Sequence, residues 1–312
     1  MRIAAMDLGS RSFHVLVAEV GPGGCLGCLA RDKAVLDLGH SVARTGQVGA
    51  RAAGRAVAVV RRFRRLAEAL GVDRVVAVGT GAFRQAGDGA ELAERIRREA
   101  GVQLEVASGA REAELVFAGV RGAGCAGPGP VLAADLGAGS LELMVGDAGG
   151  LRWSASLELG VARLTAELVR SDPLSEADRR ALAGRIGAWL GPLEGPVAAL
   201  GPRALVGSGG TLSALARMAA GARPRGQGRL AVGRPQLAPV LAQARDLPRH
   251  RRRGLEGADP ARLDLLPAGS LVLEALMDRF GFDSLTLSPW GLREGMVLEA
   301  LAAARRPAPA SP

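Results

Sequence analysis

The sequence predicts an α/β protein made of two similar lobes around a cleft. The first observation behind this prediction is a phrase that occurs twice: an apolar run meets Asp-Leu-Gly within residues 3–10 and again within 131–140. A second apolar run follows each copy, which is typical of a strand, a tight turn and another strand. The second observation is that helical patterns and short apolar runs alternate after each copy, as in α/β domains. The two copies therefore indicate a duplicated domain.

The first half of the chain is predicted to open with a hairpin. Its strands are expected at 3–6, 13–20, 26–36, 74–78 and 102–106. Its helices are expected at about 50–70, 89–100 and 108–119. Gly71 and Gly101 directly follow the first two helical patterns, at the position where glycine commonly ends a helix.

The second half restarts with the repeated hairpin after a glycine-rich stretch at 121–130, which is the best candidate for a linker. Its helices are expected at about 161–170, 175–190, 210–220, 235–246, 267–280 and 291–304, and further strands at 204–206 and 284–287. We therefore expect lobes at 1–124 and 125–304. A Pro/Ala-rich tail at 305–312 is expected to be disordered.

The composition of this 312-residue chain narrows the class of protein and of ligand. No apolar run approaches the roughly 20 residues that cross a bilayer, and the N-terminus lacks the layout of a signal peptide, so a cytoplasmic protein without a membrane partner is expected. The net charge of +9 favours a polyanionic ligand, although a bias toward arginine runs along the whole sequence. Aromatic residues are only 3% and tyrosine is absent, which argues against nucleic acid. A phosphate-rich small or linear polyanion fits better.

The two repeated turns carry residues suited to phosphate. Glycines let the backbone approach a ligand closely, and their N–H groups and a neighbouring serine hydroxyl can hold phosphate oxygens. An aspartate at the end of the strand can hold a cation that neutralises the phosphate. Asp-x-Gly also closes ordinary hairpins, so the duplication carries the argument. The candidates are Asp7, Gly9 and Ser10 in the first turn, and Asp135, Gly137, Gly139 and Ser140 in the second.

Other candidates follow predicted strands. Arg84 comes after the strand at 74–78 and is able to grip a phosphate with two hydrogen bonds, although a surface arginine is an equal reading. Glu112 falls in the first turn of the helix that Ser108 opens, where a glutamate also simply complements the helix dipole. Glu142 lies on the same strand face as Ser140, so its carboxylate is expected beside that of Asp135.

A third glycine turn follows the strand at 204–206 and opens a helix, whose N-terminal N–H groups would bind an anion. Its candidate phosphate-binding residues are Gly207, Gly209 and Thr211. A glycine turn alone is weak evidence. This one is the third of its kind in the chain.

Together these residues resemble the exopolyphosphatase/guanosine pentaphosphate phosphatase (Ppx/GppA) family, within the superfamily of actin, sugar kinases and the Hsp70 ATPase domain. The resemblance covers nearly the whole chain and implies two ribonuclease-H-like lobes with a cleft between them. The stretches that carry it are 4–17 (AAMDLGSRSFHVLV), 80–86 (TGAFRQA), 107–120 (ASGAREAELVFAGV), 131–146 (VLAADLGAGSLELMVG), 156–164 (SLELGVARL), 206–215 (VGSGGTLSAL), 262–277 and 287–296 (LSPWGLREGM).

The resemblance also implies roles. Glu112 aligns with the family's catalytic glutamate, and Arg84 with an arginine that grips phosphate. Asp135 and Glu142 match acidic residues of the second phosphate loop, which with Asp7 would organise Mg²⁺ or Mn²⁺. The other candidates of the three glycine turns would hold phosphate oxygens.

The chain departs from the family pattern at several positions. Arg11 stands in place of a usual asparagine, Arg111 in place of the first glutamate of Glu-Glu, and Glu114 in place of a common arginine. Ala138 and Leu141 interrupt the usual Gly-Gly-Gly-Ser-Thr-Glu. The Cβ of Ala138 would hinder a phosphate if that position required a positive φ. The sequence leaves open whether Ala138, Leu141 and Arg111 reduce activity.

The expected activity is that of an exopolyphosphatase, which removes the terminal phosphate of inorganic polyphosphate, with short chains favoured because the sequence stops after the two lobes. The alternative is hydrolysis of guanosine pentaphosphate (pppGpp) by the same residues. More distant alternatives are an ATP-dependent kinase and a catalytically weak polyphosphate- or nucleotide-binding regulator. A homodimer is possible. The sequence does not decide the preferred chain length, the metal or the oligomeric state.

Overall fold

The structure is a computed structural model that describes residues 1–21, 25–221 and 229–305. The chain forms two units. Unit 1 combines Met1–Gly122 with the segment that begins at Leu292, and unit 2 is Ala123–Gly291. The first boundary falls inside the stretch that the sequence predicts as a linker. The tail predicted at 305–312 lies outside the described residues from position 306 onward.

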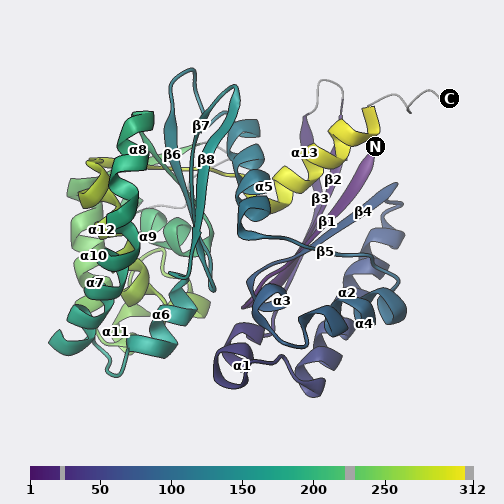
Figure 1. Ribbon diagram of the computed structural model, residues 1–312, viewed down its shortest axis with the longest axis horizontal. Coiled ribbons are helices and arrows are strands. Elements are labelled where there is room, and N and C mark those ends of the chain that lie inside the picture. The colour runs from purple at the N-terminus through teal and green to yellow at the C-terminus, as the bar shows by residue number, and fades with distance from the viewer. Residues whose placement is uncertain (22–24, 222–228, 306–312) are drawn as a thin grey trace. The chain divides into compact units, whose positions relative to one another are not determined.

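Unit 1 contains a five-stranded sheet with the order β3-β2-β1-β4-β5 (Figure 1). Its strands are β1 (Arg2–Leu8), β2 (Ser12–Val20), β3 (Leu26–Val35), β4 (Arg74–Gly79) and β5 (Glu105–Val106). β1, β2 and β3 form an antiparallel meander, whereas β4 pairs parallel with β1 and β5 parallel with β4. The carboxyl ends of β1 and β4 therefore lie at one edge of the sheet, where α/β proteins commonly bind ligands.

Helices cover both faces of this sheet. They are α1 (Leu38–Thr45), α2 (Ala50–Ala69), α3 (Gly81–Gln85), α4 (Gly89–Ala100), α5 (Gly109–Gly122) and α13 (Leu292–Arg305). The side chains of Ala4 and Met6 in β1 join an apolar core with α2 and α4 on one face. Ile3 and Ala5 alternate with them and join a second core with α13 on the other face. This alternation along β1 follows from the two-residue period of a strand.

Helix α13 belongs to unit 1, although the sequence prediction placed it in the second lobe (125–304). Met296 and Val297 are buried in the same core as Ile3 and Ala5, and α13 lies beside α5 (Figure 1). A Cβ on Gly295 would overlap the carbonyl of Leu115 in α5, so a glycine is needed where the two helices cross. Helical periodicity reveals the apolar face of α13 but not the sheet that this face covers.

Unit 2 contains a six-stranded sheet with the order β10-β11-β9-β6-β7-β8. Its strands are β6 (Val131–Leu136), β7 (Leu141–Asp147), β8 (Gly150–Leu157), β9 (Leu205–Ser208), β10 (Leu230–Gly233) and β11 (Ser284–Leu287). β6, β7 and β8 form a meander, β9 is parallel to β6, and β11 is parallel to β9. Apart from the added β10, this is the strand order of unit 1. The predicted duplication is confirmed in topology.

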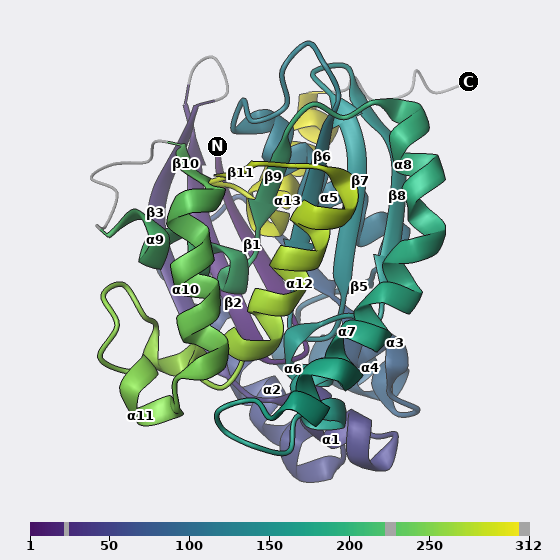
Figure 2. The ribbon, with the colours of Figure 1, turned by 90° about the vertical axis from the view of Figure 1, so that its left-hand side faces the viewer.

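One large apolar core lies under the helices of unit 2. These are α6 (Val161–Leu168), α7 (Glu176–Leu190), α8 (Glu194–Leu200), α9 (Gly210–Ala220), α10 (Arg234–Asp246), α11 (Arg249–Arg252) and α12 (Leu266–Phe280), with 3-10 turns η2 (Gly191–Leu193) and η3 (Pro260–Arg262). α10 and α12 lie side by side (Figure 2). None of the described helices is both long and apolar enough to span a membrane.

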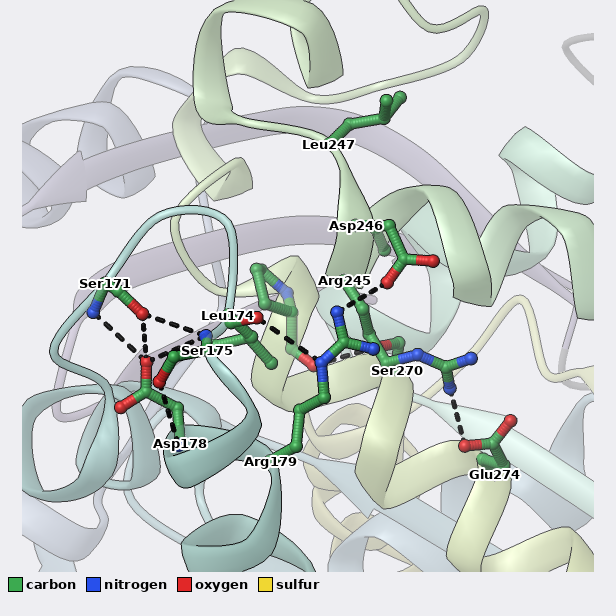
Figure 3. A network of polar contacts seen from close by, with 12 residues as sticks. Ser171, Leu174, Ser175, Asp178, Arg179, Arg245, Asp246, Leu247, Ser270 and Glu274 are labelled. Carbon is green, nitrogen blue, oxygen red and sulfur yellow. Dashed lines mark hydrogen bonds and ion pairs between the residues drawn. The ribbon is translucent and has the colours of Figure 1, made fainter.

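A polar network fixes the start of α7 (Figure 3). The buried carboxylate of Asp178 accepts hydrogen bonds from the backbone N–H groups of Arg170, Ser171 and Ser175 over 3.1–3.2 Å, and one from the Ser171 hydroxyl. These bonds, led by the one from the Ser171 hydroxyl, lower the pKa of Asp178 from 3.8 to about 2. The Ser175 hydroxyl accepts from the N–H of Asp178 at 3.1 Å and completes a capping box.

Candidate active site

Glu112 lies in the first turn of α5, as predicted, and its side chain is buried. The Oγ of Ser108 accepts a hydrogen bond from the N–H of Arg111 at 3.1 Å, which confirms Ser108 as the residue that caps this helix. Nη1 of Arg84 donates to Oε2 of Glu112 at 3.0 Å and to the carbonyl of Ala107 at 2.7 Å. Arg84 therefore fixes the direction of the Glu112 carboxylate. Contact of Arg84 with phosphate stays a prediction.

The first glycine turn contacts the segment that carries Arg84. The N–H of Gly9 donates to the carbonyl of Ser12 at 3.2 Å and closes the hairpin. Ser10 is nearly buried because a glycine lies on either side of it: a Cβ on Gly39 would come 3.0 Å from the Cβ of Ser10, and one on Gly81 would come 2.9 Å from its Oγ. Gly81 is the first residue of α3, which also contains Arg84. The structure thus joins Ser10, Arg84 and Glu112 through direct neighbours in unit 1.

Asp7 lies near the end of β1, between His14 of β2 and Val78 of β4. A Cβ on Gly9 would come 3.6 Å from Oδ1 of Asp7 and 3.9 Å from Oγ1 of Thr80. The Asp7 carboxylate and the Thr80 hydroxyl therefore flank the first turn. Asp7 is half-buried, so it remains open to solvent on one side.

Asp135 and Glu142 are direct partners across β6 and β7, so their side chains share one face. This confirms the predicted strand face, because Leu141 and Leu143 point into the core on the other side. The hydroxyl of Ser208 donates to Oδ1 of Asp135 at 2.7 Å. The hydroxyl of Ser156 in β8 donates to Oε1 of Glu142 at 2.8 Å. Both carboxylates are thus oriented by a serine.

The third glycine turn meets Asp135. Gly209 has a φ of +81°, and a Cβ there would come 2.6 Å from Oδ1 of Asp135 and 2.8 Å from the carbonyl of Leu136. Only glycine fits this position. Gly207 instead makes room for the side chains of Leu285 and Leu212, so the structure gives it a packing role.

Thr211 is fully buried, and its methyl group lies over Gly269 of α12. Its hydroxyl has no hydrogen-bond partner among the described residues. The predicted phosphate contact of Thr211 stays a prediction. The observed contact is packing between α9 and α12.

The second glycine turn is closed by a hydrogen bond from the N–H of Gly137 to the carbonyl of Ser140 at 3.0 Å. Ala138 does not have a positive φ; among the described residues, Asp37 is the one non-glycine residue that does. The condition under which the Ala138 Cβ was expected to hinder a phosphate, a positive φ, is therefore not met. The carbonyl of Ala138 accepts from the N–H of Ala162 at 3.0 Å, which ties the turn to the start of α6.

Gly160 supports this turn from the side of α6. A Cβ on Gly160 would overlap the backbone of Gly139, Ser140 and Ala138. Gly160, Ser156 and Ser208, which contact candidate site residues, were not among the candidates predicted from the sequence. Gly160 was detectable only as part of the family-like stretch at 156–164, because a glycine that leaves space for a distant turn has no signal of its own.

Arg111 pairs with three glutamates other than Glu112. Its guanidinium contacts Glu105 at 2.9 Å, Glu114 at 3.4 Å and both carboxylate oxygens of Glu299 in α13. The contact with Arg111 lowers the pKa of Glu299. The two departures from the family pattern, Arg111 and Glu114, thus form an ion pair one turn apart on α5. Each compensates for the other's change of charge.

The described residues contain no group of three or more His, Cys, Asp or Glu side chains gathered as a metal site. Asp135 and Glu142 nevertheless supply two adjacent carboxylates. Mg²⁺ commonly binds through one or two protein carboxylates, water and substrate phosphates. The donors of unit 2 therefore fit a magnesium ion.

The model of the Ppx/GppA phosphatase family matches residues 16–304. The chain belongs to this family. Exopolyphosphatase 1 of Mycobacterium leprae is 31% identical over 306 residues, which are 96% of this chain and 90% of the relative. The guanosine-5'-triphosphate,3'-diphosphate pyrophosphatase of Aeromonas hydrophila is 30% identical over 94% of this chain and 58% of its own length.

Solved structures of the Ppx/GppA family have the same fold. An exopolyphosphatase from Cytophaga hutchinsonii superposes with a TM-score of 0.91 at 28% identity, over 97% of this chain and 98% of its own. The Aquifex aeolicus family member gives a TM-score of 0.85 at 25% identity, over 98% and 99%. The predicted two-lobed α/β fold of the actin-like superfamily is confirmed.

Proposed function

We propose that this chain is an exopolyphosphatase, a hydrolase that releases orthophosphate from the end of inorganic polyphosphate. The observation that carries the proposal is the buried Glu112, held by Arg84 at the start of α5. Support also comes from a relative named exopolyphosphatase, which matches over 96% of this chain and 90% of its own length.

In the proposed reaction Glu112 acts as the general base. Its carboxylate takes a proton from a water molecule as the water oxygen attacks the terminal phosphorus. The bond between that phosphorus and the bridging oxygen breaks, and the bridging oxygen stays on the shortened chain. Arg84 keeps the carboxylate directed at the water, because a base must be within hydrogen-bond reach of the proton it removes.

Backbone groups and hydroxyls hold the phosphate oxygens in this proposal. Gly9 and Ser10 act in unit 1, and Gly137, Gly139, Ser140 and Gly209 in unit 2. Phosphoryl transfer depends mainly on positioning and on offsetting negative charge, which such groups provide.

A divalent cation, Mg²⁺ or Mn²⁺, is part of the proposal. Asp135 and Glu142 would hold it, and Asp7 would contribute directly or through water. When bound, such an ion neutralises charge on the phosphate oxygens. Ser208 and Ser156 would orient these carboxylates, as partners of metal ligands commonly do.

Release of orthophosphate from polyphosphates of defined length, with and without Mg²⁺, tests the proposal. We expect release that depends on the metal and a product one phosphate shorter. Hydrolysis of pppGpp is measured in parallel, because a relative named for that activity also matches. A much higher kcat/KM on pppGpp than on polyphosphate would favour the nucleotide. No hydrolysis of either substrate, with retained binding, would favour a regulator.

Location and assembly are also proposed: a cytoplasmic enzyme that forms a homodimer. Cell fractionation tests the first statement, and light scattering of the purified protein tests the second. A monomer at the protein concentrations used in the activity assay would contradict the proposed dimer and leave the proposed activity intact.

A further inference from the structure

A row of three side chains crosses the meander in each unit. In unit 1, Asp7 of β1 pairs with His14 of β2, and His14 pairs with Lys33 of β3. In unit 2, Asp135 of β6 pairs with Glu142 of β7, and Glu142 pairs with Ser156 of β8. Directly paired residues point to the same face of a sheet. The duplicated fold therefore contains two rows at corresponding places.

The chemistry of the two rows differs. The row of unit 2 has two carboxylates and a hydroxyl, which suits a cation. The row of unit 1 has one carboxylate, an imidazole and an ammonium group. Lys33 supplies the ammonium group of the unit 1 row. The corresponding position in unit 2 is Ser156, whose hydroxyl donates to Glu142.

Lys33 lies where the sheet face is open. Two residues earlier on the same face, Arg31 binds the buried Glu294 of α13 at 3.0 Å, so α13 covers the sheet as far as Arg31. Lys33 and Val35 are exposed, and the Val35 side of the strand pairs with Ser12 next to the first glycine turn. The guanidinium of Arg62 in α2 donates a hydrogen bond to the carbonyl of Lys33 at 3.4 Å.

The separation between Asp7 and Lys33 across the sheet indicates which phosphate of a bound chain would lie beside Lys33. Asp7 and Lys33 are separated by two strand spacings, roughly 10 Å. The phosphate held by Gly9 and Ser10 at the first glycine turn and the phosphate beside Lys33 would then be different groups of one chain. The residue is also the single lysine among 40 basic residues. An ammonium group binds phosphate as a compact point charge with three donors.

We propose that Lys33 binds a non-terminal phosphate of a linear polyphosphate and so favours phosphate chains over single phosphate groups. This inference rests on the proposed function, since it names a further subsite for the same substrate. The terminal phosphate would be handled by the residues already assigned, and Lys33 would hold the chain behind it.

The test compares Lys33→Gln and Lys33→Arg with the wild-type chain. Arg65→Gln is the matched control, because it removes one charge from an exposed position on α2, which covers the opposite face of the sheet. Calorimetry with EDTA present measures the affinity for long-chain polyphosphate and for orthophosphate over a range of salt concentrations. Thermal unfolding checks that each variant is folded.

We expect Lys33→Gln to weaken binding of long chains by about three- to tenfold. The slope of log K against log salt is expected to fall by roughly 0.7, the value for one lost contact with a single-stranded polyanion. Lys33→Arg and Arg65→Gln should bind like wild type, and orthophosphate affinity should not change in any variant.

Equal affinity of Lys33→Gln and wild type for long chains would overturn the inference and leave the proposed function intact. A loss shared by Lys33→Arg, or one of equal size for orthophosphate, would overturn it too. The first would indicate a packing effect on β3, and the second a contact with the terminal phosphate. Failure of the wild-type protein to bind or hydrolyse polyphosphate would instead remove the proposed function.

Discussion

Arg84 and Glu112 form an ion pair whose nitrogen and oxygen lie 3.0 Å apart, and the same nitrogen of Arg84 also donates to the carbonyl of Ala107. The guanidinium is therefore anchored to the backbone just before α5 as well as to the carboxylate inside it. This second anchor limits the directions that the Glu112 side chain can take. In the proposed reaction, this anchoring would present the Glu112 carboxylate to one water position.

Glu112→Gln should lower turnover of polyphosphate by roughly 10²–10⁴-fold while leaving binding largely intact, because the amide cannot accept the proton. Glu114→Gln is the matched control on the same helix, where the side chain is exposed and pairs with Arg111. Orthophosphate release and equilibrium binding measure the two effects. Near-normal turnover in Glu112→Gln would rule out the assigned base.

Arg84→Gln should lower kcat by about 100-fold or less, because the Glu112 carboxylate can still accept a proton but is no longer held in one direction by Arg84. Arg95→Gln serves as the comparison, because it breaks an ion pair of similar length with Glu99 on α4. Steady-state kinetics separate kcat from KM. A rise in KM with unchanged kcat would mean that Arg84 acts on the phosphate, as the sequence suggested, and not on Glu112.

Gly160→Ala should displace the turn at Gly139 and Ser140, because the added methyl group overlaps their backbone. We expect a loss of about 1–3 kcal/mol in unfolding free energy and a larger proportional loss of activity. Gly184→Ala, on an exposed position of α7 with open space around it, should raise stability by about 0.5–1 kcal/mol and keep activity. Chemical denaturation and phosphate release are the measurements. Full activity in Gly160→Ala would show that the turn need not keep its position.

Asp178→Asn should destabilise the protein by about 1–3 kcal/mol near neutral pH, because four donors lose a charged acceptor. The folded pKa of Asp178, about 2, lies below its ordinary 3.8, so the ionised form stabilises the fold above about pH 4. This contribution is lost as pH falls from 4 toward 2. The stability difference between wild type and variant should therefore shrink over that range in denaturation curves. A constant difference from pH 6 to pH 2 would contradict the role of the charge.

The sequence predicted the parts of the fold that repeat or follow a period. The phrase around Asp7 and its copy around Asp135 revealed the duplication, and Gly71, with a φ of +60°, ended α2 close to the expected place. The strand β8 was overlooked because its residues are half-buried and do not alternate clearly. Such a strand is recognised only through its pairing with β7.

The sequence predicted the acidic residues and glycines of the candidate site. It did not predict the residues that hold them in position. Asp135 and Glu142 were expected on one face, and the register confirms it. Ser208 and Gly160 act by touching these groups from elements that are far away in sequence. Only a structure shows such contacts, because the local sequence around a serine or glycine does not indicate which distant residue it contacts.

The return of α13 to unit 1 has a consequence for biogenesis. A ribosome makes the chain from its N-terminus, so Ile3 and Leu16 emerge first, whereas Met296 and Val297 emerge only after all of unit 2. The part of this apolar face that α13 covers therefore stays exposed while the whole second unit is synthesised. During that interval unit 2 can close its own core, whereas the apolar residues of unit 1 that α13 covers stay exposed. A pause in translation between Gly291 and α13 should therefore leave the nascent protein more prone to aggregate than a pause after α13.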